Sequence, residues 1–132
     1  GGAVPLSIDQ LIQESGVEPE SDSNLNPDRN YERQWAHTLL AMVKSKLRQE
    51  FTKAGRLEVF DALQVYLSGG KDEAPYQAVA QQLEMSVAAV KKNVERMRRQ
   101  FGQILRDEIG ETVLHPSEIE DELRFLREAL KN

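Results

Sequence analysis

The sequence contains no cysteine, which excludes disulfide bonds, thiolate metal sites and cysteine nucleophiles. It has no apolar run near the ~20 residues that a membrane-spanning helix needs, so no membrane span is expected. Its start, Gly1–Pro5, lacks the basic and apolar regions of a secretory signal. These absences favour a reducing, cytoplasmic compartment. The leading glycines, without an initiator methionine, indicate a fragment of a longer protein.

Residues that would support catalysis are also scarce. The only two histidines, His37 and His115, lie far apart and in different settings, so a metal pair is not expected. The stretch Ser68–Pro75 contains two glycines and a lysine but lacks the spacing of a phosphate-binding loop. The acidic residues have no accompanying nucleophile or apolar pocket. We therefore expect no enzyme, no metal site and no cofactor.

No alternating β pattern is present, and the apolar residues recur instead at helical spacing, which predicts an all-α helical bundle. One stripe comprises Tyr31, Trp35, Leu39, Met42, Val43, Leu47 and Phe51. The expected helices after it cover about 57–67, 75–83 and 87–109, with an additional C-terminal helix over 119–130. Ser117 and Glu120 have the spacing of a capping box for that last helix. Tyr31 and Trp35 are expected in the core.

The N-terminal part differs in composition. Residues 7–15 predict a short helix, since Ser7 and Gln10 have capping-box spacing and Gly16 can end it. Residues 17–30 contain two prolines and three asparagines and are typical of a linker. The chain is thus divided into a connector over 1–30 and a helical domain over 31–132.

Positive charge is concentrated in one segment. Between Ser86 and Arg106 there are six Lys or Arg residues and one carboxylate, Glu95. The segment therefore carries +5 within a chain whose net charge is −5. The acidic remainder would repel nucleic acid, so a duplex would have to meet this segment alone. The carboxylates of residues 118–122 would either pack away from such a surface or shield it.

The segment follows a predicted turn, Leu83–Ser86, in which Ser86 can cap the helix after it. A short helix, a short turn and a second helix make a helix-turn-helix, with Ala80 at the closest approach of the two helices. At 100° per residue, one side of the second helix is an apolar seam, made of Val90, Val94, Met97 and Phe101. The opposite side carries Lys92, Glu95, Arg96 and Arg99, and the flanks carry Lys91 and Arg98.

The motif resembles region 4 of sigma-70 family RNA polymerase sigma factors of the extracytoplasmic-function (ECF) type. The matching positions are Tyr76, Val79, Ala80, Leu83, Met85, Ser86, Ala89, Val90 and Lys91. The resemblance to one ECF-like group extends over about 27–130, and this combined pattern is more specific than the helix-turn-helix motif alone. Two residues depart from the pattern, because Glu84 replaces a glycine and Ala78 replaces a glutamate. If position 84 has a positive φ, its side chain costs roughly 1 kcal/mol.

The resemblance implies a module that recognises the −35 promoter element and docks on the β-flap of RNA polymerase core, with an anti-sigma factor as a further partner. Region 2 of the family would precede this chain. The residues that it assigns to DNA binding, together with the helix N-terminus, are Ser86, Val87, Ala88, Lys91, Lys92, Glu95, Arg96 and Arg99. Lys91 is the best candidate for a base contact. Glu95 would either accept from a cytosine amino group or pair with Lys91, Arg98 or Arg99, and we favour the pairing.

Two other interpretations stay open. A stand-alone helix-turn-helix regulator would bind its operator as a dimer. A helical protein-interaction domain would not bind DNA at all. The sequence does not give the promoter sequence, the inducing signal or the oligomeric state.

Overall fold

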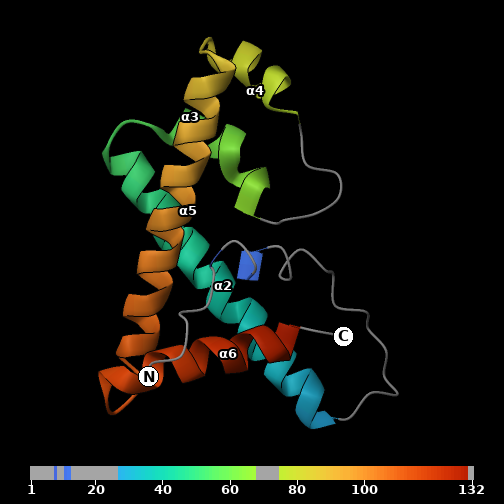
Figure 1. The fold of residues 1–132 in the computed structure, drawn as a ribbon, viewed down its shortest axis with the longest axis vertical. Coiled ribbons are helices and arrows are strands. Elements are labelled where there is room, and N and C mark those ends of the chain that lie inside the picture. The colour runs from blue at the N-terminus through green and yellow to red at the C-terminus, as the bar shows by residue number, and fades with distance from the viewer. Residues whose placement is uncertain (1–7, 9–10, 13–26, 68–74, 131–132) are drawn as a thin grey trace.

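The structure is a computed structural model that describes residues 8, 11–12, 27–67 and 75–130. This part of the chain is an all-α helical bundle without strands, as the sequence predicts (Figure 1). Short 3₁₀ turns cover Gln64–Leu67 and Pro116–Glu118. The α-helices are α2 (Pro27–Lys53), α3 (Leu57–Leu63), α4 (Tyr76–Leu83), α5 (Val87–Gly110) and α6 (Ile119–Leu130).

The helix α5 organises the bundle, since it packs against α2, α4 and α6. Figure 1 shows α4 near one end of α5 and α6 crossing near the other. The buried residues of α5 recur every three or four positions along its whole length: Val90, Val94, Met97, Phe101, Leu105 and Ile109. This spacing keeps one side of the helix in the core and leaves the other side in solvent.

The N-terminal segment contributes to the same core. Leu11 and Ile12 are fully buried, and Ile8 packs at Gly102 on α5. A Cβ at position 102 would lie 2.7 Å from Cγ1 of Ile8, so the close approach requires glycine there. The backbone is helical at these three residues, within the predicted helix over 7–15. The rest of that helix, residues 17–26 of the predicted linker and the predicted loop over 68–74 lie outside the described residues.

The first long helix begins earlier than the sequence predicts. It starts at Pro27 and therefore includes four residues that composition assigns to the linker. Proline suits the first turn of a helix because its missing N–H would have no intrahelical partner there, and Asp28 is favoured near the helix N-terminus by the dipole. The proline that marks a linker in the sequence is thus a helix start.

Two residues of the predicted α2 stripe are not in the core. Tyr31 is 75% exposed and Met42 is 41% exposed, whereas Val43 is fully buried. At 100° per residue, Met42 lies about 100° and Tyr31 about 120° from Val43 around the helix, outside the buried side. The prediction that Tyr31 is a core residue is therefore wrong. Trp35 is half-buried and packs on Phe125 of α6, with ring centroids 5.5 Å apart.

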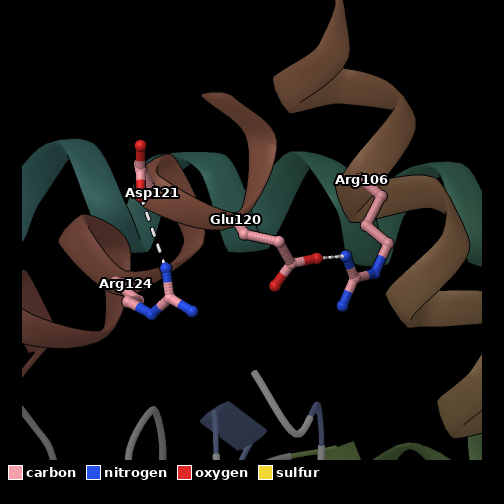
Figure 2. Close-up of polar contacts among 4 residues, drawn as sticks. All are labelled: Arg106, Glu120, Asp121 and Arg124. Atoms are coloured by element: carbon pink, nitrogen blue, oxygen red, sulfur yellow. Dashed lines mark hydrogen bonds and ion pairs between the residues drawn. The ribbon is translucent and has the colours of Figure 1, made fainter. Parts of the chain in front are cut away.

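The start of α6 is capped differently from the prediction. Instead of Ser117 and Glu120, the Glu118 carboxylate accepts from the backbone N–H groups of Leu114 and His115, at 3.0 and 3.3 Å. Glu120 accepts from the guanidinium of Arg106 on α5 (Figure 2). The cap forms two residues earlier because Pro116 begins a 3₁₀ turn that leads into α6.

The acidic helix α6 lies away from the start of α5. It packs against α2 and α5, and the Arg106–Glu120 ion pair joins it to the C-terminal half of α5. In Figure 1 it lies near the end of α5 opposite α4. Of the two expected placements of these carboxylates, the structure has the one in which they pack away from residues 86–99.

Candidate nucleic-acid interface

Three residues separate the end of α4 from the start of α5. Helix α4 ends at Leu83, and Glu84 follows in the left-handed region with φ 55° and ψ 45°. The N–H groups of Glu84 and Met85 donate to the carbonyls of Gln81 and Ala80, at 3.3 and 3.0 Å, which closes the end of α4. The turn predicted at residues 83–86, between the two helices, is therefore present.

Helix α5 begins directly after this turn. Ser86 has extended backbone angles, and its Oγ accepts from the N–H of Ala89 at 3.1 Å. This is the predicted N-cap, and it satisfies one of the N–H groups that a helix start leaves without a partner. The remaining free N–H groups and the helix dipole give this end a partial positive charge.

The apolar seam predicted for α5 is confirmed. Val90, Val94, Met97 and Phe101 are at most 4% exposed. Ala80 on α4 is also buried, and α4 packs directly on α5. Since one side of α5 is fixed in the core, the orientation of its opposite side is fixed as well.

That opposite side is open to solvent. Val87 is 43% exposed, and all the sequence-predicted site residues are exposed: Ser86, Val87, Ala88, Lys91, Lys92, Glu95, Arg96 and Arg99. They lie on the N-cap and on residues 87–99 of a single helix. The structure therefore brings the whole predicted set onto one surface, which we call the α5 cationic face.

Two cations of the segment are used inside the bundle. Arg98 donates through Nε and Nη2 to the carbonyl oxygen of Tyr66, at 3.1 and 2.9 Å. Arg106 is paired with Glu120. Tyr66 lies in the 3₁₀ turn Gln64–Leu67, so Arg98 ties this turn to α5.

The favoured pairing of Glu95 is not found. No ion pair joins its carboxylate to Lys91, Arg98 or Arg99. Arg98 is bound to Tyr66, and a lysine four residues before a glutamate has the weaker order for a helical pair. An exposed pair with Arg99 would gain little in water. The Glu95 carboxylate thus stays on the α5 cationic face as an acceptor.

A polar network that the sequence does not reveal holds the first turns of α5. Asn93 donates to the carbonyl of Ala89 at 2.8 Å and accepts from Nη2 of Arg56 at 2.8 Å. The Arg56 guanidinium also lies over the ring of Phe51, 5.6 Å from its centroid. Because Arg56 precedes α3 and Asn93 lies in α5, the network links two distant parts of the chain. No local pattern could have indicated it.

Other chemistry is not organised in the described residues. They contain no group of three or more acidic or histidine side chains placed to hold a metal ion. Burial, with nearby Arg33 contributing, lowers the pKa of His37 below its ordinary value. His115 lies far along the chain, before α6. Nor does any helix in the described ranges have the length and apolar character needed to cross a bilayer.

The backbone at Glu84 gives a direct stability prediction. A non-glycine residue with left-handed angles costs about 1 kcal/mol or more, because its Cβ approaches the following carbonyl. We therefore expect Glu84→Gly to raise the free energy of unfolding by about 1 kcal/mol, measured by urea denaturation. The same change at exposed Gln82, inside α4, should instead lower it by about 1 kcal/mol. Destabilisation by Glu84→Gly would contradict this interpretation of the turn.

Comparison of the chain with known protein families, with curated proteins and with solved structures finds no match.

Proposed function

We propose that this chain is the −35-recognition module of an ECF-type sigma factor, with α4 and α5 as its helix-turn-helix. The observation that carries the proposal is the α5 cationic face. It begins at the Ser86 N-cap and is exposed, while the other side of α5 is buried. A recognition helix needs both properties, because its inner side must be fixed for its outer side to keep one register in the major groove.

The chemistry of the face suits duplex DNA. Lys91, Lys92 and Arg96 are cations that can neutralise phosphates or donate to guanine O6 and N7. The first turn presents the small side chains of Ser86 and Ala88 beside Val87, and its free N–H groups attract a phosphate. Glu95 can accept from a cytosine amino group, since no other described side chain neutralises it.

The acidic parts of the chain support the same assignment. The carboxylates of α6 lie near the far end of α5 and do not cover the face. A duplex on the first half of α5 would therefore not meet them. The resemblance to region 4 adds the expected partners, which are the β-flap of RNA polymerase core and an anti-sigma factor, and a cytoplasmic location.

Selection of bound sequences from random duplex DNA tests the proposal, with polymerase core and the full-length parent protein reconstituted as holoenzyme. We expect enrichment of one short upstream element at a fixed distance from the start site. The element should be lost when Lys91, Lys92 and Arg96 are replaced by alanine. Enrichment of a palindrome by the chain alone would instead indicate a dimeric regulator. No enrichment at all would favour a protein-interaction domain.

A further inference from the structure

A second surface of the protein is apolar. Of the five large apolar side chains that are clearly exposed in the described part of the chain, three line one groove between α2 and α6. Tyr31 is 75% exposed, Leu114 is 89% exposed and Phe125 is 44% exposed. Half-buried Trp35 and Val113 complete its apolar lining. We call this the α2–α6 groove, and its volume is about 640 Å³.

The groove is built by specific contacts. The Glu118 carboxylate binds the N–H groups of Leu114 and His115 and so fixes the loop that presents Leu114. The rings of Trp35 and Phe125 pack at 5.5 Å with a tilt of 53°. Its apolar side chains are therefore held together at the surface by hydrogen bonding and packing.

The charge around the groove has one sign. Glu32, Glu118 and Glu122 line it, and no lysine or arginine does. Neither Glu32 nor Glu122 forms an ion pair with another described residue. Three aromatic rings, those of Tyr31, Trp35 and Phe125, add faces that attract cations. The complementary occupant therefore has apolar anchors and positive charge.

Charge also argues against two other occupants. Residues 1–26 of this chain contain five carboxylates and no lysine or arginine, so they would be repelled by the acidic rim. Duplex DNA would be repelled for the same reason. We infer that the α2–α6 groove is the docking site for a cationic amphipathic segment of a partner protein, whose apolar anchors enter the groove while flanking Lys or Arg residues meet Glu32 and Glu122.

The inference goes beyond the proposed function and does not require it. The groove lies by α6, near the end of α5 opposite the turn that begins the α5 cationic face. A partner seated there leaves Lys91, Lys92 and Arg96 accessible. The α2–α6 groove can thus hold a cationic protein segment while the α5 cationic face binds an anionic ligand.

Trp35 makes the test direct, because it is the only tryptophan of the chain and it lines the groove. Three model peptides of equal length are titrated into the full chain: an amphipathic Leu/Lys helix, a Leu/Glu helix with the same apolar pattern, and a scrambled Leu/Lys sequence. The proposal predicts a saturable change of Trp35 fluorescence with the Leu/Lys helix. It predicts binding at least 10-fold weaker for the other two peptides.

Variants then locate the contact. The double variant Tyr31→Ser/Leu114→Ser should weaken Leu/Lys binding at least 10-fold, and its circular dichroism should be unchanged since both side chains are exposed. Met42→Ser is the matched control, because Met42 is exposed on α2 but does not line the groove. Glu32→Gln/Glu122→Gln should weaken binding and reduce its dependence on salt.

Three results would overturn the proposal. The first is equal affinity for the Leu/Lys and Leu/Glu helices, and the second is unchanged binding by the double variant. The third is concentration-dependent dimerisation, measured by sedimentation, that Leu114→Ser abolishes. That result would assign the groove to a second copy of this chain.

Discussion

Replacing Met97 with alanine is expected to lower the free energy of unfolding by about 2–5 kcal/mol. Met97 has no exposed surface and lies in the apolar seam of α5, the helix that packs against α2, α4 and α6. The substitution removes buried methylene and sulfur contacts and leaves a cavity that close-packed neighbours fill only in part. The midpoint and slope of urea denaturation, followed by circular dichroism, measure the change.

The adjacent residue provides the control. Arg96 lies about 100° from Met97 around the helix and is exposed, so Arg96→Ala should change stability by no more than about 0.5 kcal/mol. Because the two substitutions are at neighbouring positions, comparing them tests which side of α5 faces the core. Equal destabilisation by the two substitutions would mean that the seam is not the buried side of the helix.

Replacing Lys91 with alanine is expected to weaken binding to the selected −35 duplex by ~1–3 kcal/mol, which is about 5- to 150-fold in Kd. Lys91 lies in the second turn of α5 and is exposed, and the Ser86 cap fixes the helix start that precedes it. A base contact predicts a loss that is largest on the selected sequence. Fluorescence anisotropy with selected and scrambled duplexes measures both affinities.

Lys53→Ala is the matched change of charge, since Lys53 ends α2 and lies outside the proposed interface. It should leave both affinities nearly unchanged. A loss for Lys91→Ala that is equal on every sequence would assign Lys91 to a phosphate rather than a base. No loss on either duplex would remove Lys91 from the interface.

The features predicted well from the sequence are local ones. The break after Leu83, the Ser86 cap and the seam from Val90 to Phe101 follow from residue type and 3.6-residue spacing, and the structure has all three. The positive φ considered for Glu84 is also present. Each of these depends on residues within a few positions of one another.

The features that were missed depend on packing between distant segments. Arg98 reaches the carbonyl of Tyr66, 32 residues away, and Arg56 reaches Asn93, 37 residues away. Neither partner is visible in a local pattern, so the sequence places Arg98 only on the flank of its helix, as a possible partner of Glu95, and predicts no role for Asn93. The sequence places Tyr31 in the core because three- and four-residue spacing from Tyr31 to Phe51, over more than five helical turns, tolerates a drift in angle around the helix that only the tertiary contacts resolve.

The salt dependence of duplex binding tests the proposed interface most directly. An isolated module should bind weakly, at ~10⁻⁴–10⁻⁶ M near physiological salt, because polymerase is not present to tether it. Titrations from low salt upward should give an association constant that falls linearly on a double-logarithmic plot. For Lys91→Ala/Lys92→Ala/Arg96→Ala the slope should be smaller in magnitude by at least about 1, since each lost phosphate contact releases about one counterion fewer. An unchanged slope in this variant, or no binding by the unmodified chain at low salt, would contradict a DNA-binding role for the α5 cationic face.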